Sequence, residues 1–293
     1  MRKVSALLFT SFLVIQLLAL FLGYQFLSNP PVSPFSNSNN ISNSYFLFAY
    51  VLITAVLLLL VLKVYKGNFL FLALEIGLIF FSAIQIFSLF LSSLYSLILS
   101  FFAIGLRFSF PSSRPYLLSF AAALVGALLG SWLGLIPAIL LAALLLVYDI
   151  VAVFFTKHMI ELAKSLSSRG AAFSITVSAN STKNKESFKN PNVSKSKVSK
   201  QTKSANKKKD SQTTSSNSLE TIELGTGDLV IPAMIIVSAL NTSLSLAIVA
   251  LAGSLTGMLA LIYLLERKKG YYPALPPLAG GAIVFILIYL VIH

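Results

Sequence analysis

Long apolar runs separated by short polar connections make up most of this chain. Most runs approach the ~20 residues that an α-helix needs to cross a hydrocarbon core of ~30 Å. The pattern therefore predicts an all-α, polytopic membrane protein with about nine transmembrane helices. The first run has an apolar core longer than the ~7–15 residues of a signal peptide, so we interpret it as a helix. The runs are 4–27, 45–65, 68–90, 92–109, 115–134, 136–158, 226–241, 243–265 and 273–292, the fourth and seventh being the shortest.

One long stretch, 165–218, interrupts the apolar pattern. It is rich in Lys, Ser and Asn and nearly free of large apolar side chains, a composition that is typical of disorder. We expect it to separate a six-helix part, 1–164, from a three-helix part, 219–293. Weak alternation in 171–178 and 219–224 fits either two short strands that pair with each other or plain loop.

Positive charge is confined to every second connection of this pattern. The net charge is +13. The Lys and Arg residues lie before the first run, and at the ends of the second, fourth, sixth and eighth runs or in the connections that follow them. The positive-inside rule then places the N-terminus and the 165–218 loop in the cytoplasm and the C-terminus outside the cell membrane. We interpret this charge as a face toward anionic membrane lipids rather than nucleic acid.

The composition excludes several classes of site. Hydrophobic residues make up 57% of the chain and charged residues 11%, which excludes an ordinary soluble domain. The chain has no cysteine, which excludes disulfides and thiolate sites, and its two histidines argue against a His-rich metal site or a Ser-His-Asp triad. We therefore expect no metal and no cofactor.

Two acids, Asp149 and Asp228, lie inside apolar runs. A carboxylate at membrane depth is costly, by about 2.5 kcal/mol or more on insertion scales, and usually marks function. Asp149 lies twelve residues after Pro137, and Asp228 lies twelve residues before Leu240. At 1.5 Å per residue each is ~18 Å from the outer end of its helix, so the two should lie at the same depth.

Two carboxyl groups at hydrogen-bond distance can share one proton over a wide pH range. The ionised group can then take a proton from water while the neutral group donates to a substrate carbonyl. This is general acid–base hydrolysis of an amide without a covalent intermediate.

The residues around these acids suit a substrate site. Gly225 and Gly227 leave room for close approach of backbone or substrate. The stretch 273–277 (PALPP) cannot be helical throughout, so the amides of Ala274 and Leu275 could bind an extended peptide; the alternative is a Pro-rich helix start.

Three motifs, Tyr148-Asp149, Gly225-x-Gly227-Asp228 and Pro273-Ala274-Leu275, resemble those of the presenilin and signal peptide peptidase family. The resemblance implies a nine-helix intramembrane aspartyl protease of the GxGD type that cuts transmembrane helices or remnant signal peptides. It implies that Asp149 and Asp228 are catalytic, that Pro273, Ala274 and Leu275 shape the active site, and that Tyr148 binds the catalytic pair or substrate. The chain resembles a prokaryotic homologue in its small size and in its mixture of features. Its orientation is presenilin-like, and its GTGDLVIP segment is peptidase-like.

Other interpretations stay open at this point. Buried acids and broken helices also occur in proton- or cation-coupled transporters and leak channels, although the two halves of this chain show no repeat symmetry. The protein could also be a scaffold with inactive acids. Glu75 could reach the membrane interface or pair with Lys66. Gly126-x-x-x-Gly130 and Gly253-x-x-x-Gly257 predict close helix packing. The pattern does not indicate an oligomeric state.

Overall fold

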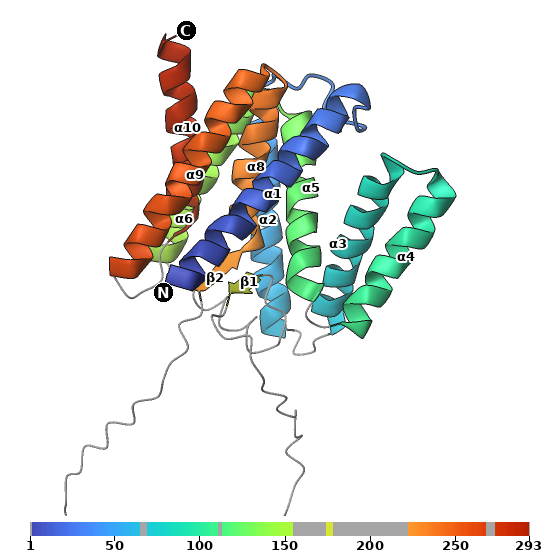
Figure 1. Ribbon diagram of the computed structural model, residues 1–293. Helices are drawn as coiled ribbons and strands as arrows, with labels where there is room; N and C mark the ends of the chain where they lie inside the picture. The colour runs from blue at the N-terminus through green and yellow to red at the C-terminus, as the bar shows by residue number, and fades with distance from the viewer. Residues whose placement is uncertain are drawn as a thin grey trace, which may run out of the picture.

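The computed structural model is a bundle of helices with one small sheet at its base (Figure 1). It describes residues 2–64, 69–110, 113–154, 174–177, 222–267 and 273–292. The elements in this part of the chain are α1 (Arg2–Ser28), α2 (Ser42–Val64), α3 (Phe69–Ser88), α4 (Ser93–Ser109), α5 (Arg114–Trp132), α6 (Leu135–Phe154), β1 (Ser174–Val177), β2 (Ile222–Gly225), α8 (Thr226–Leu240), α9 (Leu244–Arg267) and α10 (Leu275–Ile292).

The nine helices of the described ranges run alternately up and down, as the sequence predicted. We call the end that carries the N-terminus the basic end and the end that carries the C-terminus the far end. Six of the helices are long and apolar enough to cross a membrane, and α4 and α8 are among three shorter ones. The predicted all-α, polytopic architecture is therefore confirmed, including the short fourth and seventh runs.

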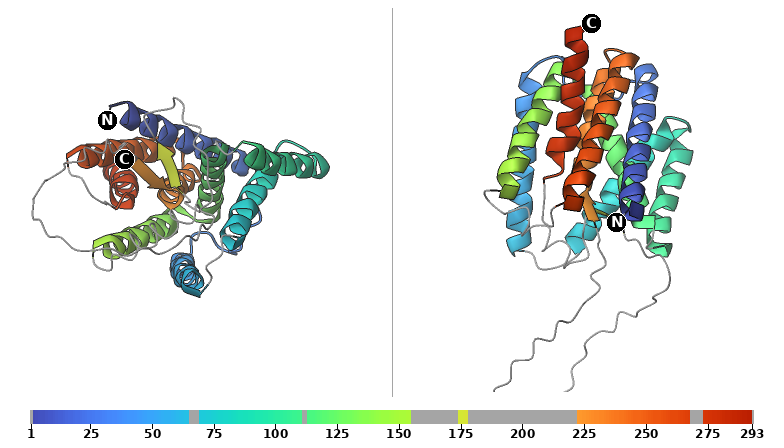
Figure 2. Two further views of the ribbon diagram at one scale, coloured as in Figure 1. Left: turned by 90° about the horizontal axis from the view of Figure 1, so that it is seen from below. Right: turned by 60° about the vertical axis from the view of Figure 1, so that its left-hand side comes forward.

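Helix α8 lies at the centre of the bundle. It packs against α1, α5, α6, α9 and α10, which surround it in Figure 2. From Leu229 to Leu240 every residue except Val230 is buried. Pro232 lies inside this helix and has no amide hydrogen to donate, so the carbonyl of Asp228 lacks its usual helical partner.

Small residues permit close approach at two helix pairs. A Cβ on Gly126 would lie 2.5 Å from the Ala233 Cβ of α8, and one on Gly253 would lie 2.5 Å from the Gly281 carbonyl of α10. Gly257 has no room for a Cβ either, because it would collide with the carbonyl of Pro277. The two small-residue motifs thus serve packing, as their spacing predicted.

Helices α3 and α4 form a hairpin at the side of the bundle, and α3 leans on α5. Polar side chains face inward in this hairpin, since Ser96 and Ser100 are the buried residues of α4. The opposite face of α4 is exposed and apolar, and it includes Phe101 and Phe102. In a membrane protein, polar side chains can face inward and apolar side chains outward, because lipid solvates the apolar side chains.

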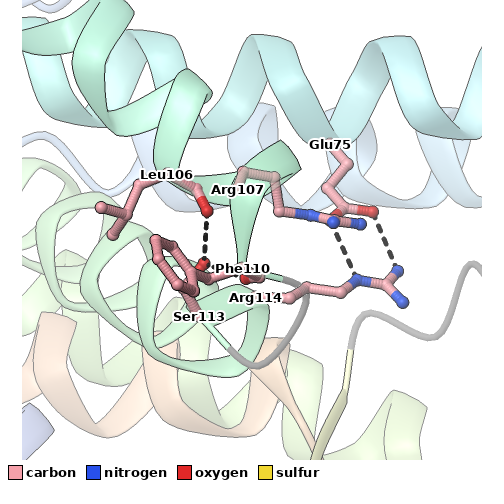
Figure 3. A network of polar contacts seen from close by, with 6 residues as sticks. All are labelled: Glu75, Leu106, Arg107, Phe110, Ser113 and Arg114. Atoms are coloured by element: carbon pink, nitrogen blue, oxygen red, sulfur yellow. Dashed lines mark hydrogen bonds and ion pairs between the residues drawn. The ribbon is translucent and has the colours of Figure 1, made fainter.

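An ion cluster ties α3, α4 and α5 together at the basic end (Figure 3). Arg107 Nε donates to Glu75 Oε1 at 2.7 Å, and Arg114 Nη2 donates to Glu75 Oε2 at 2.9 Å. Arg114 Nε also donates to Oε1, at 2.9 Å. Both oxygens of the buried Glu75 side chain therefore have arginine donors. Lys66, the partner suggested by sequence, lies outside the described residues.

Candidate active site

Asp149 lies on the side of α6 that faces the interior of the bundle. Its fractional exposure is 9%, and its Oδ2 atom is buried without a hydrogen-bond partner among the described residues. A buried carboxyl oxygen normally has a partner, because an unsatisfied acceptor is costly. An unused oxygen at this place is therefore available to a substrate, a water molecule or a second carboxyl group.

Asp228 occupies the third position of α8, directly after strand β2. Gly225 is the N-cap residue of the helix, and the Asp228 carboxyl folds back onto the backbone amide of Gly225. An acidic side chain at the third helical position reaches the N-cap amide in the capping box. The fold thus gives Asp228 a fixed direction through its own backbone.

The glycines before Asp228 have different surroundings. A Cβ on Gly225 would lie 3.1 Å from Asp228 Oδ2, whereas a Cβ on Gly227 would meet nothing within 4 Å. Gly225 therefore makes room for the aspartate itself, and Gly227 borders open space. The sequence pattern does not distinguish the two glycines, because the direction of the Asp228 side chain depends on the fold.

Helices α6 and α8 bring Asp149 and Asp228 together. The two carboxyl groups are close enough to interact electrostatically, although 78 residues lie between them in the sequence. The matched depth derived from helix rise fits this proximity.

The Pro273-Ala274-Leu275 segment lies beside Asp149. Pro273 and Ala274 precede helix α10, which begins at Leu275, and the backbone amide of Leu275 contacts the Asp149 carboxyl. The Leu275 side chain is 6% exposed and packs into the core. The Leu275 amide, which the sequence suggested could bind an extended peptide, contacts the Asp149 carboxyl in this structure, and α10 begins at the same residue.

Tyr148 is half-buried on α6 and makes no hydrogen bond to either aspartate within the described residues. Adjacent helical positions point in different directions, so Tyr148 and Asp149 do not share a face.

Strands β1 and β2 form a two-stranded antiparallel sheet at the basic end, in which Ser174 lies opposite Gly225 and Val177 opposite Ile222. Strand β2 ends at Gly225, and α8 begins at the next residue. The sheet therefore continues directly into the turn that carries Asp228. Of the alternatives left open by sequence, paired strands rather than plain loop are seen here.

Groups of three or more His, Asp or Glu side chains that could hold a metal ion are not found within the described ranges. The polar groups that converge here are two carboxyls and two backbone amides, those of Gly225 and Leu275. Such a set can bind a water molecule between the carboxyl groups and orient it by hydrogen bonds.

The family model described as signal-peptide peptidase, presenilin aspartyl protease matches residues 9–293. The chain belongs to this family. Two solved structures of a presenilin family intramembrane aspartate protease share its fold. The one in space group C222 has a TM-score of 0.66 at 21% identity and covers 99% of both chains. The one in space group P2 has a TM-score of 0.63 at 23% identity and covers 97% of this chain and 96% of that one.

A comparison with curated protein sequences gives no match. Family and fold indicate a presenilin-type intramembrane aspartyl protease, and the apolar helices make it a multi-pass membrane protein. The transporter alternative finds no support in these comparisons.

Proposed function

We propose that this presenilin-family protein is a GxGD-type endopeptidase that hydrolyses peptide bonds of transmembrane segments, with Asp149 and Asp228 as its catalytic pair. The convergence of these two carboxyl groups from separate apolar helices is the observation that carries the proposal. Glu223 lies in strand β2, and no other acid on a described helix is placed in this way. Glu75 is engaged by two arginines, and Glu266 lies at the basic end with Ser5.

Each aspartate has a role in the proposed reaction. The ionised carboxyl takes a proton from water, and the water oxygen bonds to the scissile carbonyl carbon. The neutral carboxyl donates its proton to the carbonyl oxygen, which gives a gem-diol. The carboxyl that took the water proton then donates it to the nitrogen, and the other, now ionised, carboxyl accepts a proton from one gem-diol hydroxyl. The carbon–nitrogen bond breaks, a carboxylic acid and an amine leave, and the pair again has one ionised and one neutral member.

The backbone around the pair favours this chemistry by orienting both acids. The Gly225 amide holds Asp228, and the Leu275 amide holds Asp149. Donors fixed in advance avoid reorganisation during the reaction, which is a major source of rate acceleration. In this proposal Gly227 and Tyr148 border the substrate, while Gly225, Pro273, Ala274 and Leu275 shape the site.

Strand β2 is the proposed docking edge for substrate. A transmembrane helix hides its amides in its own hydrogen-bond ladder, so it must unwind before water can attack. The unwound segment then needs new backbone partners at low dielectric. An extended peptide that pairs with an open strand edge gains such partners, and β2 leads directly to Asp228.

The charge pattern supports an orientation as well. Arg107, Arg114 and Arg267 all lie at the basic end of the bundle. We propose that the protein lies in the cell membrane. Its basic end, with the N-terminus and the 165–218 loop, then faces the cytoplasm. The partners of this protein are then transmembrane segments of substrate proteins and the surrounding lipids.

An inhibitor experiment tests the proposed activity. Purified protein is reconstituted with a generic transmembrane peptide, with and without a peptidic analogue that carries a hydroxyl group in place of the scissile carbonyl. Mass spectrometry should show internal cleavage that the analogue blocks, since the analogue resembles the gem-diol. Cleavage that the analogue leaves untouched would contradict an aspartyl mechanism, and ion flux without cleavage would favour the transport alternative.

A further inference from the structure

Gln16 is a polar residue in the buried middle of helix α1. Its side chain is 0% exposed, and it lies among apolar neighbours that include Phe12 and Ile15. Its Nε2 atom donates to the backbone carbonyl of Leu229 at 3.3 Å. Leu229 is the residue directly after Asp228. A side chain of α1 thus reaches the backbone of the helical turn that carries a proposed catalytic acid.

That turn lacks one of the usual helical hydrogen bonds. Pro232 cannot donate to the carbonyl of Asp228, and the N-cap Gly225 has no side chain that could cap the helix. The bond from Gln16 therefore supports this turn from a second helix. Helix α1 is well placed to supply it, because it packs along both α8 and α5 (Figure 1).

The second polar atom of Gln16 argues against a purely structural role. Gln16 Oε1 is buried and has no hydrogen-bond partner among the described residues. A buried acceptor without a partner lowers stability, so an apolar side chain of similar size would serve packing better. A glutamine at this position needs another explanation, and its contact with α8 offers one.

We propose that Gln16 is a positioning residue that holds the Asp228 backbone, and through it the Asp228 carboxyl, in its place opposite Asp149. This inference rests on the proposed function of the two aspartates. Small displacements of a reacting group are expensive in rate, since a shift of about 1 Å can cost a factor of ~100. Substrate docking at β2 does not involve Gln16, so the effect should fall on kcat rather than on KM.

The test compares Gln16→Met with Gln25→Met. Methionine matches glutamine in length and shape but has no amide. Gln25 lies on the same helix, is half-buried and makes no side-chain hydrogen bond among the described residues, so it is the matched control. We expect Gln16→Met to lower kcat by about tenfold to a hundredfold, with KM within twofold and an unchanged or higher Tm. Gln25→Met should match the wild type in all three.

A second variant covers the case in which Gln16→Met does not fold. Gln16→Glu keeps the length, and its protonated form keeps one donor for the Leu229 carbonyl. Its kcat should lie between those of Gln16→Met and the wild type. A wild-type kcat in folded Gln16→Met would overturn the proposal, and so would a loss of kcat that merely follows the loss of folded protein.

An infrared measurement separates this inference from the proposed function. Protein labelled with ¹³C-carboxyl aspartate has only three labelled acids, Asp149, Asp210 and Asp228. The labelled carboxyl bands should differ between Gln16→Met and the wild type, but not between Gln25→Met and the wild type. If the wild type cuts no peptide but this band difference appears, the proposed function fails and the positioning contact stands. If the wild type cuts and the bands are identical, the positioning proposal fails alone.

Discussion

At the residue scale, Gly225 and Gly227 belong to one motif, but each position favours a glycine for a different physical reason. Gly225 lies against Asp228 Oδ2, so a methyl group there has to displace the carboxyl or be displaced by it. Gly227 borders open space, and its backbone lies in the first turn of α8. The first glycine therefore constrains the acid, and the second leaves room beside it.

This difference predicts unequal effects of alanine. Gly225→Ala should lower kcat by about tenfold or more, because a contact of 3.1 Å is tighter than ordinary packing and moves the carboxyl. Gly227→Ala should fold equally well and keep its kcat, and any loss should appear in KM as crowding of substrate. Steady-state cleavage of a fluorogenic transmembrane peptide measures both. Equal kcat values for the two variants would contradict the proposed contact.

At the element scale, the start of helix α10 positions Asp149 through the backbone. Leu275→Pro removes the amide that contacts this acid, yet proline is tolerated at the first position of a helix. Leu275→Ala keeps the amide but removes a buried side chain, at a cost of about 2 kcal/mol or more. We expect the proline variant to lose kcat strongly and the alanine variant to lose mainly thermal stability. Equal activity per folded molecule in both variants would remove the amide from the mechanism.

For the ion cluster of Glu75, Arg107 and Arg114, we expect a loss of stability rather than a loss of catalytic rate. Glu75→Gln leaves Arg107 and Arg114 without their carboxylate, so the α3–α4 hairpin should detach more easily from α5. Because both arginines are partly exposed, the loss should be about 1–3 kcal/mol rather than that of a fully buried pair. Denaturation should show the lower stability, while cleavage per folded molecule stays near the wild type. A large loss of kcat at unchanged stability would instead assign Glu75 to catalysis.

The helices could be predicted from the sequence, because the length of each apolar run sets the length of its helix. The contacts between side chains of different helices could not be predicted. The runs at 92–109 and 226–241 correspond closely to α4 and α8, because helix length follows from the apolar stretch. The arginine partners of Glu75 and the contact of Gln16 with α8 depend on which helices adjoin and how each is rotated. Helices that are apolar all round give no such information.

At the scale of the whole molecule, the sheet joins the two helical parts of the chain. Val177 of β1 lies opposite Ile222 of β2, so the chain leaves and re-enters the bundle at neighbouring points. Removal of residues 181–216 would leave 178–180 and 217–221 to connect the strands. The removed segment is polar and Lys-rich, without an apolar face to pack.

We therefore expect the shortened chain to fold and to cleave its peptide at close to the wild-type rate. Shortening a loop of this length changes closure entropy by only about 1–2 kcal/mol, and in the favourable direction. Thermal unfolding and the peptide assay measure the two outcomes. Loss of both folding and cleavage would show that the segment is a structural or regulatory part of the protein.

The central claim is that Asp149 and Asp228 act as one catalytic unit. The most direct test measures cleavage of a transmembrane peptide by Asp149→Asn and Asp228→Asn, with Asp210→Asn as control, since Asp210 is the only other aspartate in the chain. Each of the first two variants should lose at least ~10³-fold in rate while remaining folded, because one carboxyl cannot serve as both acid and base. Asp210→Asn should cut like the wild type. Near-normal cleavage by either Asp149→Asn or Asp228→Asn would contradict the assignment of the pair.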